Sequence, residues 1–129
     1  MAVKFEVTGI IPAAPEDVYQ AWLDTDQHTK MTGSPARVSD QVGDEFEAWD
    51  GYIQGMNLKL ELHHRIIQSW RTTEFETIDT DSLLEINFEA HEEGTHITIR
   101  HSKLPGHGMQ YQQGWIDAYF IPMQTFFGS

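Results

Sequence analysis

Seven histidines are the side chains of this sequence best suited to metal binding or proton transfer. Two of them, His96 and His101, lie five residues apart on one predicted strand, an odd separation that sends them to opposite faces of a sheet. No pair shows the H-x-x-x-H spacing that lets two imidazoles on one helix share an ion. We therefore expect no metal site. His101 is in phase with Ile97 and Ile99, so it should face inward, either as a structural residue or as a polar contact for a ligand.

The sequence carries none of the common signatures of catalysis. It has no cysteine, no G-x-S-x-G turn around a nucleophilic serine and no glycine-rich phosphate or dinucleotide loop, so we expect no cofactor. The carboxylate pairs Asp79/Asp81 and Glu92/Glu93 fall in predicted turns, where solvation accounts for them. An enzyme that only encloses and orients its substrate would leave no motif. A cyclase-type or hydrolase-type activity therefore stays open as an alternative.

Aromatic side chains offer another kind of chemistry, the binding of apolar molecules. The chain has four tryptophans, four tyrosines and seven phenylalanines, and each of the large rings could simply fill a core, burying on the order of 200 Å². Trp70, on a predicted strand, and Trp115, on a predicted helix, are best placed to line a cavity. Apolar walls with a few phenol and imidazole groups suit a small molecule. The expected lining is Phe46, Trp70, Leu84, Ile86, Phe88, His101, Tyr111, Trp115 and Tyr119.

The C-terminal segment, residues 108–127, is predicted to form a long helix because its apolar residues recur at helical spacing. From Leu104 onward there is no lysine or arginine, and Asp117 is the only charged residue, so the segment must be mostly covered. Pro122 should kink this helix near Ala118 without ending it. One apolar stripe consists of Tyr111, Trp115, Ala118, Tyr119, Pro122 and Phe126, and a second of Ile116, Phe120, Met123 and Phe127.

The rest of the chain alternates like strands, apart from two short helices after the first strand. Pro15, followed by two carboxylates, begins the first helix, and residues 25–31 form the second. A two-residue turn is expected at Asp50-Gly51 and a bulge near Gly55 and Asn57. Strands are expected at 3–11, 45–49, 52–62, 65–74, 84–89 and 96–100. The predicted fold class is α+β, with a curved antiparallel sheet of about six to seven strands wrapped around the C-terminal helix.

Length and charge limit the possible partners. At 129 residues the chain is expected to be a single domain, 1–129. Twenty acidic and eight basic side chains give a net charge of -12, which opposes binding to nucleic acid and to anionic membranes. No stretch approaches the roughly twenty apolar residues of a membrane span, and the N-terminus lacks the pattern of a secretory signal. We expect a cytoplasmic protein.

The order of these elements and several motifs resemble the START-like (SRPBCC) helix-grip superfamily, in particular the AHSA-type family named for the activator of the heat-shock chaperone ATPase. The matching residues cover nearly the whole chain and are Trp22, Val42-Gly43-Asp44-Glu45-Phe46, Trp49-Asp50-Gly51, Ile53 with Gly55 and Asn57, Ile67-Gln68-Ser69-Trp70-Arg71, Gly94-Thr95 with Ile97 and Ile99, His101 with Leu104-Pro105, and Gly114-Trp115 followed by Tyr119-Phe120. The resemblance implies a sheet that grips the C-terminal helix, often around an apolar cavity. Members of the superfamily bind lipids, sterols, polyketides or plant hormones, and a few catalyse cyclisations. The chaperone activator itself resembles a two-domain protein whose distinct N-terminal domain, which makes much of the chaperone contact, has no counterpart in this sequence.

These observations favour a non-enzymatic domain that binds a small apolar or aromatic molecule, of unknown identity, between the C-terminal helix and the sheet. Two alternatives stay open. The first is a protein-interaction module whose partner is a chaperone ATPase or a second copy of the chain, because the helix has a wider apolar surface than one sheet is expected to cover. The second is an enzyme of the cyclase or hydrolase type that uses the same cavity, in which His101 and Tyr119 would be needed for turnover.

Overall fold

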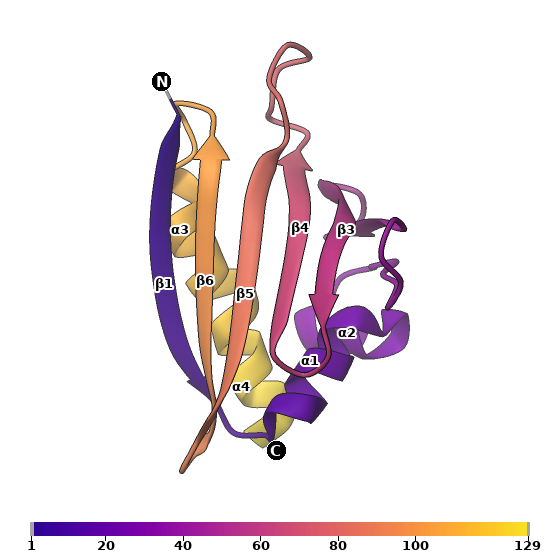
Figure 1. Ribbon diagram of the computed structural model, residues 1–129, viewed down its shortest axis with the longest axis vertical. Helices are drawn as coiled ribbons and strands as arrows, with labels where there is room; N and C mark the ends of the chain where they lie inside the picture. The colour runs from indigo at the N-terminus through magenta and orange to yellow at the C-terminus, as the bar shows by residue number, and fades with distance from the viewer. Residues whose placement is uncertain (1, 129) are drawn as a thin grey trace.

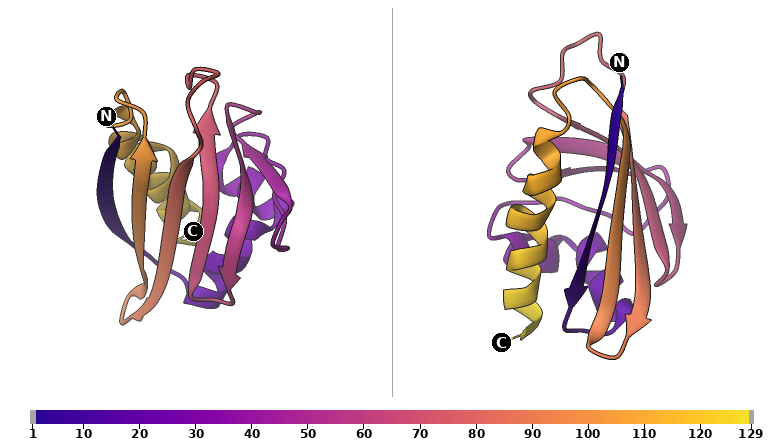
Figure 2. Two further views of the ribbon diagram at one scale, coloured as in Figure 1. Left: turned by 45° about the horizontal axis from the view of Figure 1, so that its top comes forward. Right: turned by 90° about the vertical axis from the view of Figure 1, so that its left-hand side faces the viewer.

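In the computed structural model, which describes residues 2–128, six antiparallel strands form one curved sheet with the helices on its inner side (Figures 1 and 2). The order across the sheet is β1-β6-β5-β4-β3-β2, so the first strand pairs with the last. This is the α+β helix-grip arrangement expected from the sequence. The strands are β1 (Val3–Ile11), β2 (Glu45–Ala48), β3 (Ile53–Glu61), β4 (Arg65–Thr72), β5 (Ser82–His91) and β6 (Gly94–Leu104). The helices are α1 (Pro15–Leu23), α2 (Thr25–Thr32), α3 (Gln110–Trp115), the π-helical turn η1 (Ile116–Phe120) and α4 (Ile121–Gly128).

Alternating side chains in β5 and β6 give the sheet one apolar face and one polar face. In β5, Leu84 and Ile86 are buried, whereas Glu85 and Asn87 are half-exposed on the opposite face. The register pairs Ile86 with Ile99 of β6, and neither residue is exposed to solvent. Apolar residues therefore line the inner face, on which the helices pack, while polar residues face water.

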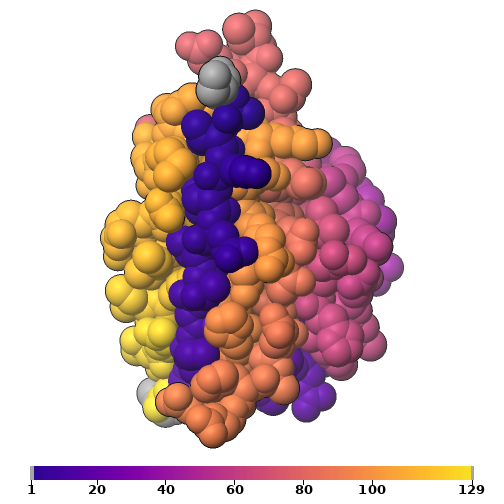
Figure 3. Space-filling view, turned by 60° about the vertical axis from the view of Figure 1, so that its left-hand side comes forward, coloured from indigo at the N-terminus to yellow at the C-terminus, as the bar shows by residue number. Residues whose placement is uncertain are grey.

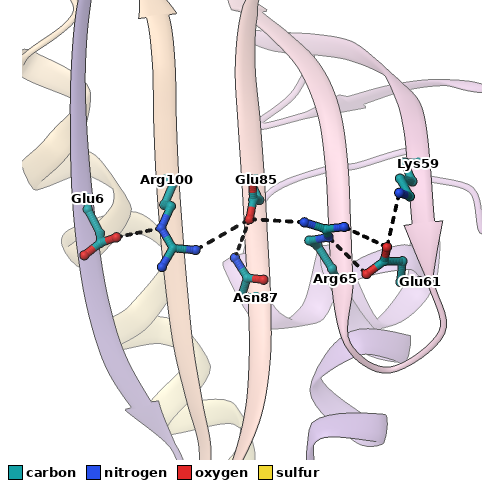
Figure 4. Close-up of polar contacts among 7 residues, drawn as sticks. All are labelled: Glu6, Lys59, Glu61, Arg65, Glu85, Asn87 and Arg100. Atoms are coloured by element: carbon teal, nitrogen blue, oxygen red, sulfur yellow. Dashed lines mark hydrogen bonds and ion pairs between the residues drawn. The ribbon is translucent and has the colours of Figure 1, made fainter.

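Charged side chains on the outer face form one connected row across the strands (Figure 4). Arg100 on β6 lies 2.7 Å from Glu6 on β1 and 3.5 Å from Glu85 on β5. Arg65 on β4 lies 3.8 Å from the same Glu85 and 2.7 Å from Glu61 on β3. The hydrogen bonds from Arg65 lower the pKa of the Glu61 carboxyl. Since these groups are largely solvated, each pair contributes little to stability.

The C-terminal helix runs as one rod along the inner face of the sheet (Figure 2). In η1 the N–H of Ile121 donates to the carbonyl of Ile116, a spacing of five residues that widens the helix. The wide turn directly precedes Pro122, which has no N–H and whose ring would crowd the Ala118 carbonyl in a regular helix. The helix therefore continues past Pro122 to Gly128, as the sequence predicts. Among residues 2–128, no helix has both the length and the apolar character that a membrane span requires.

The wide turn also changes which residues face the sheet. Tyr111, Trp115 and Tyr119 of the predicted apolar stripe are buried, but the next buried positions are Phe120 and Met123. Pro122 and Phe126, which the sequence placed on the main stripe, are only half-buried. This part of the prediction is wrong because one extra residue in a turn rotates the following residues by about 100° around the helix axis.

Strand β1 pairs with β6 and packs against the terminal helix. It lies on the surface between that helix and β6 (Figure 3). Gly9 of β1 allows a close approach of the helix, because a Cβ atom at this position would lie 2.9 Å from the ring of Phe120. The helix is thus fixed along one edge of the sheet, and its other side faces β3 and β4.

The turn between β2 and β3 is longer than the sequence predicted. β2 ends at Ala48 and β3 begins at Ile53, and these two residues pair with each other. The connection therefore has four residues, Trp49–Tyr52, instead of the predicted pair Asp50-Gly51. The first three of them have positive φ angles of 53°, 58° and 87°. Within this turn the side chain of Trp49 is half-buried.

Candidate functional site

A cavity of about 340 Å³ lies between the C-terminal helix and the end of the sheet formed by the β2–β3 turn, β3 and β4. It is partly open to solvent, and the surface that faces it is almost entirely carbon. The sheet side contributes Trp49, Tyr52, Ile53 and Trp70, and the helix side contributes Tyr111, Gly114, Trp115, Ala118 and Tyr119. Such a volume and such a lining are typical of small-molecule pockets.

Small residues on the helix create this space. Gly114 and Ala118 are one helical turn apart and lie on the face that carries Tyr111, Trp115 and Tyr119. A Cβ atom added at Gly114 would meet no other atom within 4 Å. The cavity therefore lies where the helix lacks bulk, while the large rings around it keep helix and sheet apart.

Stacked aromatic rings form the rigid wall of the cavity. Trp22 of α1 stacks on Tyr119 with ring centroids 4.7 Å apart and an angle of 23° between the planes. Trp115 lies 5.0 Å from Tyr119, and Trp70 lies 5.7 Å from Trp115. Contacts of this kind restrict the rings. The wall is thus preformed, and Trp22 of α1 supports its Tyr119 ring.

The hydroxyl groups of two lining tyrosines, Tyr111 and Tyr119, form hydrogen bonds with other protein side chains and not with the cavity. His28 Nδ1 lies 2.8 Å from the carbonyl of Trp22, so Nδ1 carries the proton and Nε2 accepts from the Tyr119 hydroxyl at 2.9 Å. Burial lowers the pKa of His28 and raises the pKa of Tyr119, which keeps both groups neutral. The Tyr111 hydroxyl lies 2.6 Å from the hydroxyl of Thr72. The rings therefore face the cavity while their hydroxyls are paired in the protein.

His101 does not line the cavity, and both of its ring nitrogens are hydrogen-bonded within the protein. Its Nδ1 accepts from the indole N–H of Trp115 at 3.1 Å, because an indole nitrogen can only donate. Its Nε2 then donates to Ser82 Oγ at 2.8 Å, and Ser82 donates to the carbonyl of Trp70 at 2.7 Å. Burial lowers the pKa of His101 to about 3. The side chain thus faces inward, as expected, orients the Trp115 indole by a hydrogen bond and makes an edge-on contact with the ring of Trp70, with centroids 4.5 Å apart.

Comparison with known protein families identifies the family of this chain. Residues 12–122 match the family described as "Activator of Hsp90 ATPase homolog 1-like protein". The chain belongs to this family. The resemblance seen in the sequence motifs is thereby confirmed at the level of the family and its fold. No curated protein matches the chain.

Solved structures share the fold of this AHSA1-like chain. An HSP90 activator from Plasmodium falciparum superimposes with a TM-score of 0.86 at 24% sequence identity, over 97% of this chain and 96% of that one. A protein from Mesorhizobium loti gives a TM-score of 0.81 at 16% identity, over 98% and 97% of the two chains. CalU16 from Micromonospora echinospora gives 0.75 at 19% identity, over 97% of this chain and 73% of that one. At these identities the similarity establishes the fold alone.

Four of the nine residues predicted to line a cavity in this AHSA1-like domain do so, namely Trp70, Tyr111, Trp115 and Tyr119. The other five lie elsewhere. Leu84 and Ile86 are buried in the sheet core, His101 stands behind the wall, Phe88 packs on Tyr19 at 5.6 Å, and Phe46 lies against Gly55. Phe88 is covered by Tyr19 of α1, whereas Phe46 lines a polar hollow at the β2 edge of the sheet. Contact with a ligand remains a prediction for each of the nine.

Five lining residues were not anticipated, and their sequence signals were weak. Gly114 and Ala118 have the i, i+4 spacing of small residues on an aromatic helix face, which could have indicated missing bulk. Ile53 is the first residue of β3, and Trp49 and Tyr52 belong to the turn before it. A turn residue can face inward or outward, so the sequence alone does not place these two rings.

Polar contacts link the sheet and the helix at the rim of the cavity. The Tyr52 hydroxyl bonds to the carboxylate of Glu74, and Gln110 at the start of α3 donates to the same carboxylate at 2.9 Å. Burial raises the pKa of Tyr52, and the bond to Glu74 adds to this rise. Glu74 thus holds the end of α3 against the β2–β3 turn.

A second hollow, of about 650 Å³, lies at the β2 edge of the sheet and is polar. Four of its five charged lining residues form ion pairs, since Arg37 lies 3.4 Å from Glu47 and Arg71 lies 2.8 Å from Asp81. Within the part of the chain that is described, no three His, Asp or Glu side chains are grouped so that they could hold a metal ion. The carbon-lined cavity is therefore the best candidate for a functional site.

Proposed function

We propose that this domain binds a small aromatic or apolar molecule in the cavity between the C-terminal helix and the sheet. The observation that supports the proposal is the partly open, carbon-lined cavity of about 340 Å³ with its preformed aromatic wall. Burying apolar ligand surface against such a wall gains about 25 cal/mol per Å² before the costs of association. A preformed wall keeps those costs low because few side chains must be ordered on binding.

The volume of the cavity limits the size of the ligand. A water molecule occupies about 30 Å³ of the liquid, so 340 Å³ corresponds to roughly a dozen non-hydrogen atoms. A two-ring aromatic molecule has this size. At about 0.5 kcal/mol per atom, which lies within the range for small ligands, the binding free energy is near -6 kcal/mol, and the Kd falls in the range of roughly 10–100 μM.

The direct test uses naphthalene as the probe and a variant in which the cavity is filled. The four tryptophan indole N–H signals can be followed by NMR during the titration. Gly114→Leu should abolish binding, because position 114 faces the cavity and has open space for a side chain. Gly106→Leu is the matched control, since Gly106 also has open space around it but lies on an exposed loop outside the cavity.

The expected result is saturable binding to the wild type and to Gly106→Leu, with loss of binding in Gly114→Leu. If naphthalene causes no saturable change in the wild type, or if Gly114→Leu binds it equally well, the cavity is not the binding site and the proposal is wrong. Thermal unfolding of all three proteins checks that the variants remain folded.

A second candidate function is contact with an Hsp90-type chaperone. It is supported by the family to which the chain belongs and by the structural similarity to the HSP90 activator from Plasmodium falciparum. The domain would then alter the rate at which the chaperone hydrolyses ATP. Adding the purified chain to the chaperone should change that rate in a saturable manner, and an unchanged rate would exclude this role. Light scattering on the same sample distinguishes a monomer from a homodimer, which is the remaining partner that we consider.

A further inference from the structure

Two buried side-chain atoms in residues 2–128 have no hydrogen-bond partner, and one of them belongs to the cavity lining. They are Trp49 Nε1 and Gln68 Oε1. Gln68 lies outside the lining, and its Nε2 donates to Asn57 at 2.9 Å. Trp49 is a lining residue, and its indole nitrogen can only donate. A buried donor without an acceptor is unfavourable and calls for an explanation.

The backbone holds this indole in place. Trp49 and Asp50 have φ angles of 53° and 58°, in the left-handed region that a bulky residue rarely adopts. The Asp50 N–H donates to the carbonyl of Pro35 at 2.8 Å, which ties the turn to the segment before β2. Strained backbone that is fixed from outside is typical of residues with a function. The turn therefore keeps the ring of Trp49 at the cavity at the expense of local strain.

The hydroxyl of Tyr119 does not satisfy this donor. The Tyr119 hydroxyl donates its own proton to His28 Nε2 at 2.9 Å. Burial raises the pKa of Tyr119, and the nearby indole of Trp49 acts against this rise. Nevertheless, no hydrogen bond of acceptable geometry joins the two side chains. The N–H of Trp49 is thus available at a cavity that otherwise presents carbon.

We propose that the ligand of this cavity is an aromatic molecule with one uncharged hydrogen-bond acceptor, a ring nitrogen or a carbonyl oxygen, and that this acceptor binds the indole N–H of Trp49. The inference rests on the proposed function and specifies its ligand class. An anionic acceptor such as a carboxylate is disfavoured, because no lining residue is charged and the chain carries a net charge of -12.

Naphthalene and quinoline form a matched pair of probes for this inference. They have the same size and shape, and they differ by one ring nitrogen, which is uncharged at pH 8. The variant Trp49→Phe keeps an aromatic ring but removes the N–H. For each protein, the Kd for naphthalene is divided by the Kd for quinoline. The measured quantity is this ratio in the wild type divided by the same ratio in Trp49→Phe. One neutral hydrogen bond predicts a value of about 3 to 10. The differing hydration of the two probes cancels in this quotient.

A second readout does not depend on the folding of the variant. Quinoline should move the indole N–H signal of Trp49 downfield in wild-type spectra, as a new hydrogen bond does, whereas naphthalene should not. Isoquinoline places the acceptor at another ring position and is tested in parallel.

If both aza-aromatics give a quotient near 1 and no downfield shift while naphthalene still binds, this inference is overturned and the proposed function stands. If no probe binds the wild type, the proposed function fails as well.

Discussion

Acidification from pH 7 to pH 5 should lower the free energy of unfolding by about 2 kcal/mol through His101 alone. The neutral ring is held by Trp115, which donates to Nδ1, and by Ser82, which accepts from Nε2. Protonation would add a hydrogen at Nδ1, where the indole N–H already points. Two donors would then face each other in a fully buried site, and burial lowers the pKa of His101 to about 3.

The magnitude follows from the difference in pKa between the folded and unfolded chains. An unfolded histidine has a pKa of about 6.5, so between that value and 3 the unfolded chain binds a proton that folded His101 does not. This contribution to stability is therefore complete above pH 6.5 and is lost as the pH falls toward 3. The slope reaches about 1.4 kcal/mol per pH unit, and integration from pH 7 to pH 5 gives about 2 kcal/mol. Burial also lowers the pKa of His28, which acts in the same direction.

Urea unfolding at pH 7, 6 and 5 measures this effect when the wild type is compared with His101→Phe. At pH 7 the variant should be less stable by about 1–3 kcal/mol, because the Trp115 N–H loses its acceptor. Between pH 7 and 5, however, it should lose about 2 kcal/mol less than the wild type. Titration of the carboxylates affects both proteins alike and cancels in the difference. His64→Phe, at an exposed turn residue, is the control and should keep the acid sensitivity of the wild type. An equal loss in His101→Phe and the wild type would refute the argument.

Three further substitutions test the packing around the site. Gly9→Val should lower the free energy of unfolding by about 1–3 kcal/mol in urea titrations, because its Cβ would lie 2.9 Å from the ring of Phe120; an unchanged stability would show that the helix can move. Tyr119→Phe should cost a similar amount, about 1–3 kcal/mol, since His28 Nε2 loses its donor, and a neutral result would contradict that hydrogen bond. Arg71→Lys should speed proteolytic cleavage of the loop between β4 and β5 several-fold while the midpoint of global unfolding changes little, because lysine cannot make the forked bonds to the two loop carbonyls; equal cleavage rates would refute this.

Local patterns were sufficient to predict most of the fold. Side chains that face the core must be apolar, so their spacing along the sequence reveals the type of element. This spacing is two residues in β5 and β6 and helical in the C-terminal segment. The bulge expected near Asn57 lies between Asn57 and Lys59. The wide turn before Pro122 was not predictable in the same way. Proline indicates that a helix must be disturbed, but the packing of the rod on the sheet decides how the disturbance is absorbed.

The candidate site was predicted only in part because a cavity is a property of several elements together. Trp70 and Trp115 could be assigned to facing elements, since each lies on an inward phase of a strand or helix. The extent of the cavity depends instead on α1, whose Trp22 stacks on Tyr119 and fills the neighbouring space. The periodicity of a sequence predicts which face of a helix is buried, but not how much of the sheet that helix covers.

Two irregularities coincide at the cavity, and neither is expected from packing alone. Filling space is favourable, and a void of 340 Å³ would cost up to about 8 kcal/mol if it were closed and dry, which is comparable to the whole stability of a small domain. Gly114 leaves this space open and also lowers helix propensity by about 1 kcal/mol relative to alanine. Trp49 places an unpaired donor at the same cavity. Around it, His28 and His101 have a partner for each ring nitrogen. Missing bulk and a missing acceptor at one place are both accounted for by a molecule that binds there.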